Sequence, residues 1–149
     1  MTMIRRLAPP LVALLLGGCS GADPDRPSPV LDPGPHRGAL AKVDGAEGFV
    51  EVVTEPVRGA EAGGPKSRVA VYWLDRAQTG AIRPEPTDVT LTATWPGATA
   101  AAEIHLTAEP VPGDPAGAAK FVAPAADRPG QPRGTVRARL GDRAVSAAF

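Results

Sequence analysis

The residues best suited to chemistry in this chain are its single cysteine, Cys19, and its two histidines, His36 and His105. A thiol is a good nucleophile and can accept a covalent group, whereas a metal site needs several converging His, Cys, Asp or Glu ligands. The two histidines are far apart in the sequence, and His105 falls on the polar side of a predicted strand. We therefore expect both histidines to be solvated. His36 is the one candidate metal ligand; no catalytic residue, metal or cofactor is predicted.

Other polar residues lack the spacing of known catalytic or ion-binding motifs. Ser67 and Ser146 are not part of a Gly-x-Ser-x-Gly turn, which positions the serine nucleophile of many hydrolases. The acidic residues do not follow the spacing of a calcium-binding loop, and we expect four of them to be solvated turn residues: Asp75, Glu85, Asp88 and Asp114.

Composition excludes several further classes. The 149 residues include 16 Lys+Arg and 16 Asp+Glu, so the formal net charge is zero, which argues against an electrostatic nucleic-acid binder. Arg137, Arg139 and Arg143 form a short basic stripe, for which solubility is the simplest role. One cysteine cannot form an internal disulfide, and 18 prolines with 17 glycines argue against a bundle of long helices.

Residues 1–18 have the pattern of a secretory signal peptide. Arg5 and Arg6 supply a positive charge, an apolar stretch of about ten residues follows, and small residues, Gly17 and Gly18, end it. This apolar stretch is too short for a membrane span, which needs roughly 20 residues. We expect the segment to be removed on export.

The end of this segment, Leu16-Gly17-Gly18-Cys19, resembles the lipobox of bacterial lipoproteins. The resemblance implies that the peptide is cleaved between Gly18 and Cys19, that the Cys19 thiol carries a diacylglyceryl group, and that the new amine is acylated. Several acyl chains anchor a protein stably where one does not. Ser20 follows, and the sorting rule of Gram-negative lipoproteins then favours the outer membrane. The alternative is an ordinary secretory signal with an incidental cysteine.

Residues 19–37 read as the lipidated cysteine and a proline-rich linker. The stretch after Cys19 contains five prolines, few apolar side chains and no hydrophobic periodicity. Such a composition favours extended polyproline II structure, which separates a domain from its anchor. The alternative is a proline-rich ligand for a partner domain.

Residues 38–149 are predicted to form one all-β domain. Apolar and polar residues alternate over 89–95, 104–106, 136–140 and 145–149, which is typical of strands with one solvated face. Further strands are expected over 38–43, 49–53, 69–74 and 120–123, with 49–53 and 69–74 as central strands that are buried on both sides. Seven or eight short strands separated by Gly and Pro turns indicate an antiparallel β-sandwich.

This pattern resembles the single immunoglobulin-like sandwiches of uncharacterised lipoproteins from high-GC bacteria. The matching stretches are 35–38, 50–53, 69–75 and 114–117, that is, Pro-His-Arg-Gly, Val-Glu-Val-Val, Val-Ala-Val-Tyr-Trp-Leu-Asp and Asp-Pro-Ala-Gly. Arg37 replaces the first glycine that follows the histidine in that pattern.

The sequence therefore favours a lipid-anchored, non-enzymatic binding or structural module of the cell envelope, facing the periplasm or the cell surface. Its membrane contact is the anchor on Cys19, and an envelope protein is the expected kind of partner. The alternative is a periplasmic metal-handling accessory protein of a cation-efflux system, with His36 as the key ligand. An envelope hydrolase is the third and weakest hypothesis.

Overall fold

The computed structural model describes residues 33–57, 66–114, 117–127 and 130–149, and within them every regular element is a β-strand. No helix in these ranges is long and apolar enough to cross a membrane. The strands are β1 (Ala39–Lys42), β2 (Gly48–Pro56), β3 (Ser67–Asp75), β4 (Pro86–Thr94), β5 (Ala102–His105), β6 (Thr107–Ala108), β7 (Ala119–Val122), β8 (Arg133–Leu140) and β9 (Arg143–Ala148). Residues 1–32, with Gly18 and Cys19, lie outside the described ranges.

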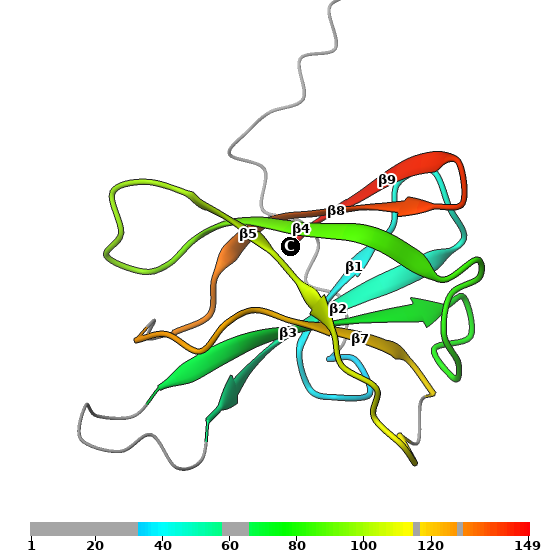
Figure 1. Cartoon of the computed structure of the whole chain (residues 1–149), viewed down its shortest axis with the longest axis horizontal. Helices are drawn as coiled ribbons and strands as arrows, with labels where there is room; N and C mark the ends of the chain where they lie inside the picture. The colour runs from blue at the N-terminus through cyan, green and yellow to red at the C-terminus, as the bar shows by residue number, and fades with distance from the viewer. Residues whose placement is uncertain (1–32, 58–65, 115–116, 128–129) are drawn as a thin grey trace, which may run out of the picture.

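The strands form two antiparallel sheets that pack face to face (Figure 1). One sheet has the order β1-β2-β3-β7-β6 and the other has the order β5-β4-β8-β9. The predicted antiparallel β-sandwich is thus confirmed. Gly141, with a φ of 60°, lies in the tight turn that joins β8 to β9, where a positive φ favours glycine.

The described residues contain nine strands because the strand expected around 104–106 is divided between the sheets. β5 pairs with β4 in the four-stranded sheet, whereas β6 pairs with β7 in the five-stranded sheet. Leu106 stands between them and donates its backbone N–H to Val89 O at 2.9 Å. The chain therefore crosses from one layer to the other at this edge of the sandwich.

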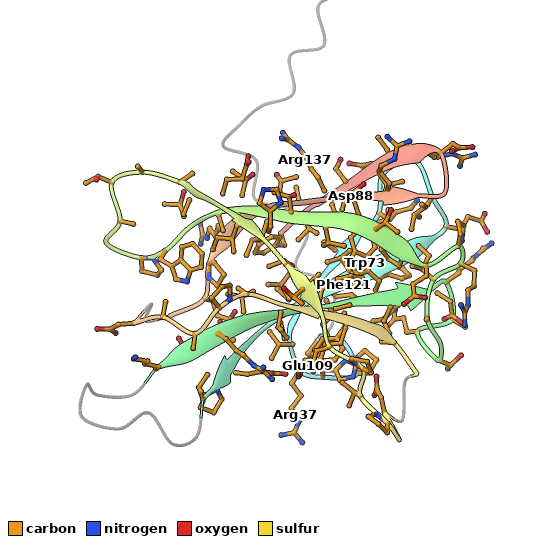
Figure 2. All side chains as sticks on the ribbon, viewed as in Figure 1. Arg37, Trp73, Asp88, Glu109, Phe121 and Arg137 are labelled. Atoms are coloured by element: carbon orange, nitrogen blue, oxygen red, sulfur yellow. The ribbon has the colours of Figure 1, made fainter. Side chains whose placement is uncertain are left out.

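The core lies between the sheets and follows the period-two alternation. Val71 and Trp73 of β3 are fully buried, and they lie opposite Leu91 of β4 and Val136 of β8, which are also fully buried. Figure 2 shows Trp73 and Phe121 between the two layers. The same alternation places polar residues on the outer face of each sheet, so the two outer faces carry different sets of polar side chains.

β3 is buried on both sides, as predicted for a central strand. Trp73 is fully buried in the core, and Tyr72, which points the opposite way, is only 6% exposed. Tyr72 is covered because the segment before β1 folds back over the outer face of the five-stranded sheet: His36 stacks on its ring. Several charged and polar side chains contact one another on this covered outer face.

Candidate functional site

Strand register places an acid, a phenol and an amine in one row on the outer face of the five-stranded sheet. Glu51 of β2 pairs with Tyr72 of β3, and Tyr72 pairs with Lys120 of β7. Paired residues of neighbouring strands share a face and lie about 5 Å apart. The row therefore arises from three strands that are distant in sequence.

His36 docks onto this row through both ring nitrogens. Nδ1 lies 2.8 Å from Glu51 Oε2, and Nε2 lies 3.1 Å from Asp114 Oδ1. The ring also stacks on Tyr72, with centroids 3.7 Å apart and planes 9° from parallel. The side chain is only 17% exposed. The expectation that His36 is solvated is therefore wrong, because its partners come from positions that local sequence does not connect to it.

Glu51 is the fully buried acceptor that holds this docked segment in place. Besides the imidazole, its carboxylate accepts the backbone N–H groups of His36 at 2.9 Å and Gly38 at 2.7 Å. A Cβ at Gly38 would come within 2.5 Å of Val52 O, so only glycine fits this close approach. The packed body therefore includes the turn at Gly34–Arg37, which the sequence assigned to the linker.

At the hydroxyl of Tyr72, Glu55 of β2 joins three side chains from neighbouring strands. Its carboxylate accepts a hydrogen bond from the Tyr72 hydroxyl at 2.8 Å, and it lies 2.9 Å from Lys120 Nζ. Arg68 of β3, its register partner, donates from Nε at 3.1 Å. The Glu55 carboxylate thus pairs with two cations, Lys120 and Arg68, and also orients the hydroxyl of Tyr72.

Glu109, which follows β6, closes the network from the other side. Arg68 donates two hydrogen bonds to its two carboxylate oxygens, at 2.6 and 2.8 Å, and Lys120 Nζ donates a third at 3.0 Å. Such two-point pairing of guanidinium and carboxylate is among the stronger polar contacts in proteins. We call the whole set the outer-face cluster: His36, Glu51, Glu55, Arg68, Tyr72, Glu109, Asp114 and Lys120.

The environment favours the protonated phenol of Tyr72 and the charged forms of Glu55 and Lys120. Burial and the neighbouring Glu55 raise the pKa of Tyr72 to about 12. Burial alone would raise the pKa of Glu55, but hydrogen bonds from Lys120 and Tyr72 outweigh it and lower that pKa. Burial opposes the charge of Lys120, yet Glu55 and Glu109 raise the pKa of its amine. At neutral pH the phenol is protonated and the amine is charged, which is the opposite of an activated base or nucleophile.

The lowered pKa of Glu55 predicts a dependence of stability on pH. A carboxyl whose pKa is lower in the folded state stabilises that state above its unfolded value of 4.5, and this contribution is lost as pH falls through the folded value. We expect Glu55→Gln to lower the free energy of unfolding by about 1–2 kcal/mol at pH 7. The difference from the wild type should narrow below pH 4.5 in urea titrations. A difference that is constant from pH 7 to pH 3 would contradict this role.

The geometry around His36 does not converge on a metal. Its two ring nitrogens contact different carboxylates, Glu51 and Asp114, on opposite sides of the ring. The residues that the structure describes contain no group of three His, Cys, Asp or Glu side chains arranged to hold a metal ion.

The other residues considered from sequence are separated by the fold. His105 is exposed on β5, as expected, with Nδ1 3.3 Å from Thr90 Oγ1. Ser146 lies in the same row of the four-stranded sheet but three strand spacings away, about 14 Å, while Ser67 belongs to the other sheet. Neither serine is therefore within reach of the His105 imidazole.

Asp75 and Asp114 act within turns. Asp75 Oδ1 accepts the backbone N–H of Thr79 at 3.1 Å, as expected of a turn residue. Asp114 accepts the N–H of Ala118 at 3.0 Å and also contacts His36, and its side chain is only 4% exposed. The expectation of a solvated Asp114 is wrong, since the docked histidine covers it.

Two clefts of about 620 and 680 Å³ lie at opposite ends of β8, away from the outer-face cluster. The first is lined by residues that include Ile82, Arg83 and Leu140, and the second by residues that include Trp95, Pro96 and Phe149. No member of the cluster lines either cleft. Neither of these two clefts therefore opens onto the cluster.

Comparisons of this chain with protein-family models, with curated proteins and with solved structures found no match.

Sequence reasoning missed most of the outer-face cluster. The signal was present in part: Glu51 and Glu55 stand four residues apart in a β-strand, so they share a face, and Glu51 interrupts the apolar stretch over 49–53. Charged residues inside a predicted central strand require buried partners. Lys120, at the start of another apolar segment, is a partner of this kind, although sequence alone does not pair the two strands.

Proposed function

We propose that this protein is a lipid-anchored binding or structural module of the cell envelope and that it has no catalytic activity. The observation that carries the proposal is Leu16-Gly17-Gly18-Cys19, in which the only cysteine of the chain occupies the acceptor position of a lipobox. A diacylglyceryl group on Cys19 and an acyl group on its amine hold the protein at the membrane, because each buried methylene contributes about 0.8 kcal/mol. Ser20 favours the outer membrane as its destination.

Two features of the described residues support a binding or structural role. Within the outer-face cluster, Glu55 and Glu109 pair with Arg68 and Lys120, and the pKa directions of Glu55 and Lys120 favour their charged forms. The cluster also fastens the segment just before β1 to the sheet, through His36 and Gly38. A pulling force on the expected linker would therefore reach the domain at this turn, where hydrogen bonds to Glu51 hold the chain on the sheet.

We also propose that the sandwich is immunoglobulin-like. The order β2-β3-β7-β6 in one sheet and β4-β8-β9 in the other agrees with the ABED and CFG sheets of an immunoglobulin constant domain. In this assignment β5 extends the second sheet, and β1 is an additional strand on the first. The conserved disulfide of antibody domains has no counterpart in a chain whose single cysteine is Cys19.

Metabolic labelling with a fatty-acid probe tests the proposal in cells that export lipoproteins. We expect the wild-type chain to take up the label and to fractionate with membranes, because the acyl chains supply its membrane affinity. The Cys19→Ala variant should take up no label. Label retained by the Cys19→Ala protein, or no label on the wild type, would show that Cys19 is not the acyl acceptor.

A further inference from the structure

The outer face of the four-stranded sheet carries exposed arginines that have no ionic partner among the described residues. In this it differs from the opposite face, where the charged residues of the outer-face cluster pair with one another. β8 alternates buried and exposed residues, so Arg133, Arg137 and Arg139 all lie on its solvent side. Residues two apart on a strand are separated by about 7 Å, which makes this row about 20 Å long. Figure 2 shows Arg137 extending away from the sandwich on this side. We call this row the arginine stripe.

The cationic groups of the stripe are open to solvent. Among the described residues, neither Arg133 nor Arg137 has a carboxylate within 4 Å or a side-chain hydrogen bond, and Arg139 bonds only to the carbonyl of Asp142, at 3.4 Å. By contrast, Arg68 on the opposite sheet is held by two carboxylates. Arg68 and Lys120 on one outer face are thus paired with carboxylates, whereas the described part of the chain places no carboxylate against Arg133 or Arg137 on the other.

Small and hydroxyl-bearing residues flank the stripe on both sides. β4 presents Thr90 and Thr92 next to it, and β9 presents Ala144 and Ser146. Beside Arg137 the short side chains leave a shallow cleft of about 430 Å³, which is lined by Ala144 and Ser146 and also by the exposed Asp44. A chain that lies along β8 can therefore reach the guanidinium groups while its hydroxyls meet those of Thr and Ser.

Acidic residues limit the width of the cationic surface. Asp88 lies in the β4 bulge, between the residues that pair with Arg137 and Arg139, and Glu103 is exposed on β5 at the edge of the sheet. Asp142 is in the turn after β8. A flat anionic membrane would face all of these carboxylates together with the arginines, whereas a narrow polymer along β8 passes Asp44 and Asp88 but does not extend to Glu103, which is two strand spacings away.

We propose that the arginine stripe binds a linear polysaccharide that carries carboxylates. Guanidinium groups pair with carboxylates through two parallel hydrogen bonds, and the row matches a ligand with repeated negative charge along one direction. Each hydroxyl of Thr90, Thr92 and Ser146 can donate and accept, so these side chains can pair with the hydroxyls that a sugar chain carries on every unit. This inference deepens the proposed function by giving the module a class of partner.

Calorimetric titration of the full-length protein in detergent tests the stripe, with polygalacturonate as the probe. Binding should weaken with added salt because the pairs are exposed. Arg137→Gln should reduce the affinity by about threefold, and Asp88→Asn should increase it by about twofold, as expected for gain or loss of one exposed charge contact. Asn tolerates the positive φ of 52° at position 88, so that variant keeps the bulge.

Arg37→Gln is the matched control, since Arg37 is exposed on the opposite side of the molecule (Figure 2) and its loss changes the net charge equally. It should leave the affinity unchanged. Equal effects of Arg37→Gln and Arg137→Gln, equal binding of fully methyl-esterified polygalacturonate, or tighter binding of poly-L-glutamate would each overturn the proposal, and so would absence of binding at low salt. Because the titration does not use the lipid, its failure leaves the labelling result for Cys19 unaffected.

Discussion

Replacing Glu51 by alanine should lower the free energy of unfolding by about 3–5 kcal/mol, the range found when one partner of a buried ionic contact is removed. The Glu51 carboxylate is fully buried, and it accepts the N–H groups of His36 and Gly38 as well as contacting the imidazole. The variant would leave these groups without an acceptor in a site closed to water. Urea unfolding at pH 7, monitored by tryptophan fluorescence, measures the change.

Glu47→Ala is the control for this experiment. The side chain of Glu47 is 82% exposed, and its one ionic partner among the described residues is Arg76, at 3.7 Å. Exposed pairs of this kind contribute little, so we expect a change of less than about 0.5 kcal/mol. If Glu51→Ala were as mild as Glu47→Ala, the docking of the His36 segment would not stabilise the fold.

Replacing Trp73 by alanine should also cost about 3–5 kcal/mol, for a different reason. Trp73 is fully buried between the two sheets, so its removal exposes no charge but leaves a cavity in the core. The Nε1–H of its indole has no hydrogen-bond partner among the described residues. The loss should therefore come from packing, and none of it from a broken hydrogen bond.

Trp73→Phe separates the contribution of ring packing from that of the buried, unpaired indole N–H. Phenylalanine keeps an aromatic ring in the core and removes the unpaired donor, whose burial is itself unfavourable. We expect it to cost about 1–2 kcal/mol, well below the alanine variant, in thermal or urea unfolding. Equal losses for the two variants would contradict a packing role, and a change below about 1 kcal/mol for Trp73→Ala would contradict the sandwich core itself.

Local periodicity was sufficient to predict most of the strands. In β8, Val136, Ala138 and Leu140 alternate with Thr135, Arg137 and Arg139, and the structure places the first set in the core and the second outside. The hydrophobic effect acts on each strand in the same way wherever its partner lies. The sandwich therefore followed from the sequence before any strand had been paired.

The outer-face cluster could not be predicted from local periodicity, because it depends on which strands are neighbours in the sheet. His36 meets Asp114, which is 78 residues away, and Tyr72 meets Lys120 through the β3–β7 pairing. Alternation gives the face of a residue on its own strand but not the register between distant strands. For the same reason the division of one expected strand into β5 and β6 at Leu106 was not predictable, since its hydrophobic alternation continues through the crossing.

The central claim, a lipid anchor at position 19, is tested most directly by the mass of the N-terminal peptide of the mature protein isolated from envelopes. The account predicts a peptide that begins at Cys19 and carries a diacylglyceryl group on sulfur and an acyl group on nitrogen. A peptide with an unmodified Cys19 thiol, or a mature chain that begins at any other residue, would contradict it.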